Sequence, residues 1–189
     1  MQMSHEPLEQ VAAAIGRSCY WWSSIEIELQ ELCSNLARFI DRSFEREEVW
    51  EVIAISLSHM DIRQRIAVAK ALAANGVDPD LYDSLERLLN RIDNELRAER
   101  NRYIHDQWTV LDETIIRRRQ GAKVIRPQSR TLEVRHSYDR AYASIDEVND
   151  FAERLATALS EVLALNQELS DLYLEIWPPE ESASPAHES

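Results

Sequence analysis

The sequence predicts a mainly α-helical protein: a bundle of about five helices with a small basic β-hairpin or arm inserted before the last helix. Apolar residues recur every three or four positions over long stretches, which places them on one face of a helix. The 189 residues include three glycines and six prolines, too few for the many turns of an all-β fold. We therefore expect one helical domain over residues 1–177 and a disordered acidic tail over residues 178–189.

Four helices are expected before the arm, over residues 7–40, 46–58, 61–75 and 79–108. Asp61 with Gln64 makes a capping box for the third helix, because each side chain can bond the backbone N–H of the other residue. Asp78-Pro79 is a pair that typically opens a helix, since proline is well tolerated at the first helical position. These local signals fix where the third and fourth helices begin.

The sequence changes in character between residues 109 and 138. β-branched residues alternate with arginine there, and Gln120-Gly121 and residues 127–129 have the composition of turns, which favours a β-hairpin or an extended arm. Ser144 followed by Glu147 is a second capping box and predicts a last helix over residues 145–176.

The charge of the chain is unevenly distributed. A net charge of -13 argues against a general nucleic-acid coat protein, because binding phosphates requires lysine and arginine. Residues 117–140 nevertheless hold eight basic residues against Glu133 and Asp139. This stretch is a candidate RNA-binding arm through Arg117, Arg118, Arg119, Lys123 and Arg126. Equally, it is typical of a solvated edge strand that arginine keeps from aggregating.

Membrane and metal sites are not expected. No apolar stretch approaches the roughly 18 to 20 residues of a membrane-spanning helix, and the start lacks the pattern of a secretory signal, which favours a cytoplasmic protein. Cys19 and Cys33 are about 21 Å apart along one predicted helix, too far for a disulfide, so we expect two buried thiols. There is no CxxC or Cys/His cluster, and we expect no metal and no other cofactor.

The segment from Arg100 to His105 carries the candidate chemistry. Asn101 and His105 are four residues apart and lie on one helix face. Arg100 continues an apolar line through Leu96 and Ile104, so burying it requires an anion or a partner acid. His105 is about 140° around the helix from Arg100. Both reach one phosphate only through the long arginine side chain, fraying of the helix, or a second copy, and a homodimer is therefore expected.

Arg100, Asn101 and His105 together resemble the R-x4-6-H signature of the HEPN superfamily, whose ribonuclease members often have Asn directly after the Arg. The family fold is a helical bundle around an antiparallel pair of long helices, with the signature near the end of an inner helix. The resemblance is specific over about six residues and only architectural elsewhere. Some HEPN toxins carry a tyrosine, modified by a partner enzyme, two residues after the histidine; here that residue is Gln107, which argues against such control.

The resemblance implies metal-independent endoribonuclease activity on RNA, in which the ribose 2′-OH attacks the adjacent phosphate and leaves a 2′,3′-cyclic phosphate. His105 would transfer the proton, because imidazole titrates near neutral pH, and Arg100 would offset charge on the phosphate. Asn101 would orient His105 or the phosphate. The setting implied is a toxin or a stress-response nuclease, with an antitoxin protein as a candidate partner.

Two other interpretations remain open. In the first, the chain is a non-catalytic HEPN-like module that binds a nucleotide or a protein partner through a cleft lined by the Arg100 to His105 segment. Alternatively, Arg100 and His105 belong to a structural salt-bridge cluster on a helical scaffold, with Glu99, Asp106 or Asp112 as partners and Trp108 packed over them. Exposure of His105 beside Arg100 would favour catalysis, and burial would favour the scaffold.

Overall fold

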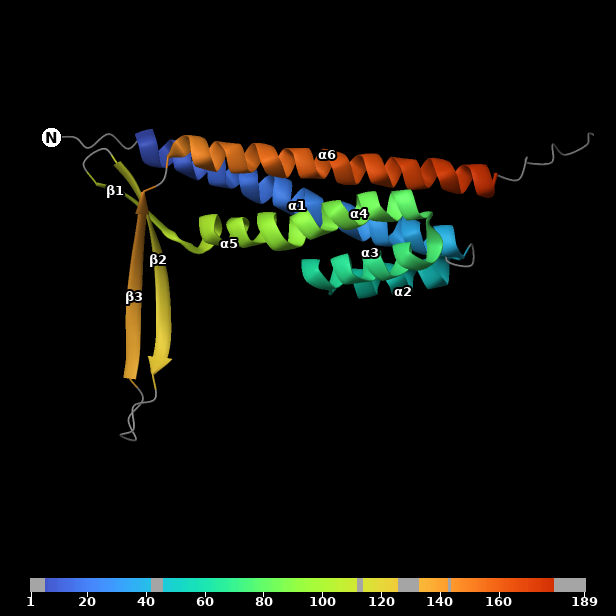
Figure 1. The fold of residues 1–189 in the computed structure, drawn as a ribbon, viewed down its shortest axis with the longest axis horizontal. Helices are drawn as coiled ribbons and strands as arrows, with labels where there is room; N and C mark the ends of the chain where they lie inside the picture. The colour runs from blue at the N-terminus through green and yellow to red at the C-terminus, as the bar shows by residue number, and fades with distance from the viewer. Residues whose placement is uncertain (1–5, 42–45, 112–113, 126–132, 143, 179–189) are drawn as a thin grey trace, which may run out of the picture. The chain divides into compact units, whose positions relative to one another are not determined.

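The computed structural model describes residues 6–41, 46–111, 114–125, 133–142 and 144–178. It confirms a mainly helical fold with a small β arm before the last helix (Figure 1). The helices agree closely with the predicted ranges. They are α1 (Glu6–Ile40), α2 (Glu47–Ser58), α3 (Ile62–Gly76), α4 (Pro79–Arg91), α5 (Arg97–His105) and α6 (Ile145–Ile176).

The fourth predicted helix is continuous but irregular. A π-helical turn, η2 (Ile92–Leu96), joins α4 to α5. The helix ends at His105, earlier than the predicted residue 108, because Trp108 pairs in a strand instead. Trp108 is four residues after Ile104 and could continue the helix, but its pairing with Arg117 holds it in a strand.

The predicted caps are confirmed. The Asp61 carboxylate accepts the Gln64 N–H at 2.9 Å, and the Gln64 side chain accepts the Asp61 N–H at 2.9 Å. Ser144 Oγ likewise accepts the Glu147 N–H at 3.1 Å, while Glu147 Oε2 accepts the Ser144 N–H at 3.3 Å. These bonds satisfy backbone donors that the first turn of a helix leaves without partners, so α3 and α6 begin where the sequence predicts.

The arm is a three-stranded antiparallel sheet in the order β1-β2-β3. Its strands are β1 (Gln107–Leu111), β2 (Thr114–Ile125) and β3 (Glu133–Tyr142). Trp108 is opposite Arg117 in the first pairing, and Arg118 is opposite Arg140 in the second. The predicted hairpin corresponds to β2 and β3, and β1 adds a third strand directly after α5.

The backbone separates into two compact units, and α1 and α6 contribute residues to both. The first unit contains Met1–Ile25 and Asn90–Leu159, and the second contains Glu26–Leu89 and Ser160–Ser189. The single domain expected over residues 1–177 remains a prediction. The acidic tail expected after Trp177 falls, from residue 179 on, outside the described residues.

Each unit has its own apolar core. In the first unit, α5 and the start of α6 run antiparallel, because Glu99 contacts Arg154 while Tyr103 contacts Phe151. Its buried side chains include Val11, Trp22, Ile25, Ile92, Leu96, Tyr103, Ile116, Val148, Phe151 and Leu155. Those of the second include Leu29, Leu32, Leu36, Leu57, Ile66, Leu85, Leu89, Val162, Leu165 and Leu169. Leu96 at the end of η2 and Tyr103 in α5 are both buried in the core of the first unit, and they fix the orientation of the last turns of α5.

Candidate functional site

The candidate site lies on the last turns of α5, directly after the π turn. In that turn the Arg97 N–H bonds the Ile92 carbonyl, five residues back, and Arg97 Nε bonds the Asp93 carbonyl at 3.1 Å. A π turn holds more residues than an α turn, so residues after it are rotated from the positions that a regular helix would give them. Leu96 and Tyr103 are buried, and Arg100 is half-buried.

Arg100 is held without an acidic partner. Its guanidinium carbon lies 5.7 Å from the centre of the Trp22 ring, and Nη1 donates to Asn101 Oδ1 at 3.2 Å. Arg100 Nε is buried and has no hydrogen-bond partner among the described residues. The sequence required an anion or a partner acid here, and no acid in the described ranges pairs with this side chain. Its positive charge is left available for an anion.

His105 is exposed at the C-terminal end of α5. Its imidazole makes no hydrogen bond or ion pair within the described part of the chain. Asn101, half-buried one turn earlier, shares its helix face and bonds Arg100. Asn101 thus bonds Arg100 and shares a helix face with His105, whereas Arg100 and His105 share no hydrogen bond in the described residues of one chain.

The acids proposed for a salt-bridge cluster pair with other cations. Glu99 accepts from Arg154 at 2.7 Å and from the Tyr103 hydroxyl at 3.3 Å. Asp106 pairs with Arg117 at 3.3 Å. The third proposed acid, at position 112, lies outside the described residues. The two described acids therefore pair with neither Arg100 nor His105.

Trp108 does not cover His105. Its indole Nε1 donates to the Tyr103 carbonyl at 2.9 Å, and its ring stacks on Tyr103 at 5.9 Å between centres. The tryptophan thus ties β1 to the end of α5 through Tyr103. His105 keeps the exposure that a proton-transfer group requires.

The residues predicted to bind RNA are not equivalent. The Arg117 side chain is 17% exposed, pairs with Asp106 and lies 5.3 Å from the Tyr103 ring centre. Arg118 is half-buried, and its Nε has no partner among the described residues. Arg119 and Lys123 belong to β2, where the structure describes only their backbone, and Arg126 lies outside the described residues. One of the five, Arg117, is thus already held against α5.

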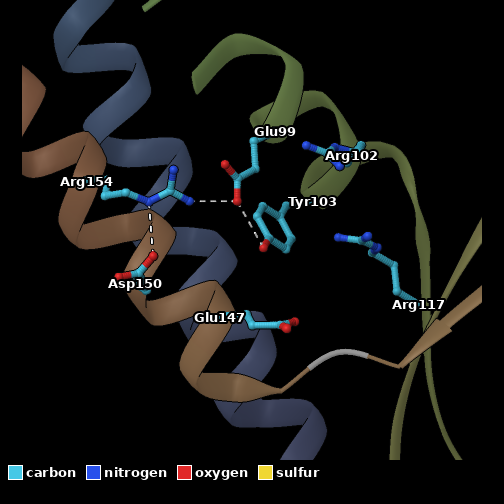
Figure 2. A pocket seen from close by; sticks show the side chains of 7 residues that line it. All are labelled: Glu99, Arg102, Tyr103, Arg117, Glu147, Asp150 and Arg154. Carbon is cyan, nitrogen blue, oxygen red and sulfur yellow. Dashed lines mark hydrogen bonds and ion pairs between the residues drawn. The ribbon is translucent and has the colours of Figure 1, made fainter. Parts of the chain in front are cut away.

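A cavity of about 300 Å³ adjoins the segment, and the sequence did not indicate it (Figure 2). It is lined by Glu99, Arg102, Tyr103, Arg117, Glu147, Asp150 and Arg154. It includes neither Arg100, Asn101 nor His105. These residues come from α5, β2 and α6, so their spacing along the chain does not indicate that they meet. Residues on one helix are the exception, such as Asp150 and Arg154, which are four residues apart.

Tyr103 forms the buried wall of this cavity. Its ring lies 5.0 Å from Phe151, and it is only 5% exposed. Burial, together with the neighbouring Glu99 carboxylate, raises the pKa of the Tyr103 hydroxyl, so the phenol stays protonated and donates to Glu99. Tyr103 therefore fixes Glu99 in place and has no role as a base at neutral pH.

No cluster of His, Cys, Asp or Glu that could hold a metal ion lies within the described residues. Cys33 is buried as expected, but Cys19 is only half-buried, and both are free thiols. No helix in the described ranges is long and apolar enough to span a membrane. Comparison with protein-family models, curated proteins and solved structures finds no match, so the likeness to the HEPN superfamily rests on Arg100, Asn101, His105 and the helical architecture.

Proposed function

We propose that this chain is an HEPN-like, metal-independent endoribonuclease that uses Arg100, Asn101 and His105. The observation that carries the proposal is the environment of the Arg100 and His105 side chains. Arg100 is half-buried with no acidic partner among the described residues, and His105 is exposed with none. A structural ion-pair cluster would have paired them with acids, whereas Glu99 pairs with Arg154 and Asp106 pairs with Arg117.

The reaction follows from these groups. Neutral His105 takes the proton of the ribose 2′-OH as that oxygen attacks the adjacent phosphorus. The bond from phosphorus to the 5′ oxygen breaks, and the leaving oxygen takes a proton from water. The products are a 2′,3′-cyclic phosphate and a 5′-hydroxyl. Arg100 offsets the charge that develops on the phosphate oxygens, and Asn101 holds the guanidinium through its 3.2 Å bond.

A second copy of the chain completes the site in this proposal. Arg100 and His105 point about 140° apart on one helix, so a two-fold dimer supplies the arginine of one copy and the histidine of the other. Mixing the inactive variants Arg100→Ala and His105→Ala should then restore about a quarter of the parent activity, because half of the dimers are mixed and carry one intact site. Sites formed within one chain would leave the mixture inactive.

The activity itself is tested by incubating purified protein with total RNA in EDTA and analysing the ends of the products. Cyclic phosphate ends are expected, and His105→Ala should slow cleavage by about 10² to 10⁴-fold. His59→Ala is the matched control, since His59 is also an exposed histidine at a helix C-terminus and should have no effect. Equal rates for His105→Ala and the parent would overturn the proposal. Nucleotide binding without cleavage would favour the non-catalytic module.

A further inference from the structure

The exposed face of α5 carries a second cation beside His105. Ala98, Arg102 and His105 are all exposed, at the spacing that places them on one side of the helix. Arg102 is about 60° around the helix from His105, compared with about 140° for Arg100. The Arg102 guanidinium makes no ion pair or hydrogen bond within the described part of the chain. Arg102 is therefore the free cation nearest to the histidine along the helix.

Arg102 also lines the cavity, where Arg117 lies near it. Figure 2 shows both side chains on one side of the Tyr103 ring, with Arg154 on the other side. The ion pair of Arg117 with Asp106 runs through Nε at 3.3 Å, and the position of its guanidinium is fixed further by the Tyr103 ring. A fixed guanidinium beside a free one suits a phosphate, because both can donate to its oxygens.

The acids of the cavity are unequal in their effect on an anion. Glu99 and Asp150 accept from Arg154 at 2.7 and 3.0 Å, so that arginine offsets their charge. Glu147 has no cation partner among the described residues, and its carboxylate accepts only the Ser144 N–H. Glu147 is thus the residue that opposes an anion in the cavity.

We infer that Arg102, assisted by Arg117, binds a phosphate of single-stranded RNA next to the bond that His105 cleaves. The inference rests on the proposed ribonuclease activity and adds the place where the RNA backbone next to the cleaved bond is bound. Cleavage requires one phosphate at His105, and an RNA strand supplies another close by. Arg102, three residues before His105 on the same face, is placed to receive it.

Binding is tested with a short 2′-O-methyl RNA, which lacks the attacking hydroxyl and cannot be cleaved by this route. Arg102→Ala should raise its Kd about tenfold, as expected for loss of a charge-assisted hydrogen bond. The slope of log K against log salt should fall by about 0.7. Arg87→Ala is the control, because Arg87 is an exposed arginine on α4 in the second unit and should not change the Kd.

Glu147→Gln provides a change of the opposite sign. Glutamine can still cap α6, so the fold is kept, while removal of the negative charge should tighten binding by about two- to threefold. Inorganic phosphate and a mononucleotide are tested in parallel. Tighter binding of the oligonucleotide than of either supports an RNA backbone site, and equal Arg102-dependent binding of inorganic phosphate would overturn it.

The outcomes separate this inference from the proposed function. An unchanged Kd for Arg102→Ala would overturn the inference even where the parent cleaves RNA. Binding that depends on Arg102, in a parent that releases no cyclic phosphate ends, would overturn the ribonuclease proposal and leave a phosphate-binding surface. A parent that neither binds nor cleaves would overturn both.

Discussion

Two half-buried arginines, one in each unit, are held in opposite ways. In the second unit, all three nitrogen atoms of the Arg65 guanidinium donate to backbone carbonyls, at 3.0 Å to Leu57, 2.7 Å to Glu26 and 3.4 Å to Ser58. In the first unit, Arg100 makes one bond to its neighbour Asn101 and leaves a buried Nε without a partner among the described residues. The two residues share a type and a degree of burial but not a role.

The difference separates an arginine that stabilises the fold from one that is available to a ligand. Leu57 and Ser58 lie in the last turn of α2, whose carbonyls lack partners within the helix. Arg65 donates to both carbonyls, in addition to the Met60 N–H at Leu57, and it also joins α3 to α1 through Glu26. Arg100 donates to no backbone group in the described part of the chain, so its burial costs free energy that a bound anion would offset.

The largest expected effect is on catalysis. Arg100→Ala should slow RNA cleavage by about 10² to 10³-fold, as for loss of a donor that stabilises charge in a transition state. The free energy of unfolding should change by less than about 1 kcal/mol, because the substitution also removes an unsatisfied buried donor. Single-turnover cleavage and urea unfolding measure the two quantities. Strong destabilisation with unchanged cleavage would make Arg100 a structural residue like Arg65.

The converse is expected for Arg65. Arg65→Ala should lower the free energy of unfolding by about 2 to 4 kcal/mol, because three carbonyl acceptors lose a charged donor. Cleavage per folded molecule should stay at the parent level. Arg65→Met keeps much of the apolar stem and separates packing from hydrogen bonding. If the methionine variant were as stable as the parent, the bonds of Arg65 would contribute nothing.

Cys33 reports on the Arg65 cluster directly. Its thiol donates to the Arg65 carbonyl at 3.4 Å, and burial raises the pKa of Cys33 to about 12. Thiolate is the reactive form, so at pH 8 the folded Cys19→Ser protein should react with a thiol reagent at least roughly a hundredfold more slowly than the unfolded chain. Arg65→Ala should speed the reaction and Arg100→Ala should not. Equal acceleration by both would mean that Arg100 also stabilises the fold that buries Cys33.

The smallest effects are expected at the helix caps, one in each unit. Asp61→Ala in the second unit and Ser144→Ala in the first should each lower the free energy of unfolding by about 0.5 to 2 kcal/mol. Urea unfolding monitored by circular dichroism measures both losses. A loss at one cap only would show that the other helix start is held by packing alone.

Local signals predicted most of the fold. Helical periodicity and the capping boxes at Asp61 and Ser144 depend on residues within a few positions of each other, so the sequence displays them directly. The same holds for Asn101 and His105, which share a face by spacing alone. The start of strand β1 was missed because Trp108 fits a helical repeat, and its pairing with Arg117 across the sheet instead places it in a strand.

The cavity could not be predicted, because its walls meet only after folding. Glu99 and Arg154 are 55 positions apart, yet their 2.7 Å bond forms one wall. The pairing of Arg117 with Asp106 likewise depends on how β2 returns towards α5. A sequence can show that these residues are charged, but it cannot show which charges neutralise each other.

The π turn at Ile92–Leu96 sets the rotation of the candidate site about the helix axis. Such a turn is equivalent to an α-helix with one extra residue, so deleting the exposed Asn94 would restore a regular repeat. Everything from Arg97 to His105 would then turn by about 100° relative to the residues before it. Tyr103 would leave the core and the histidine would face another direction, with every side chain of the segment unchanged. The presence of one extra residue in this turn thus determines in which direction Arg100, Asn101 and His105 point from the helix.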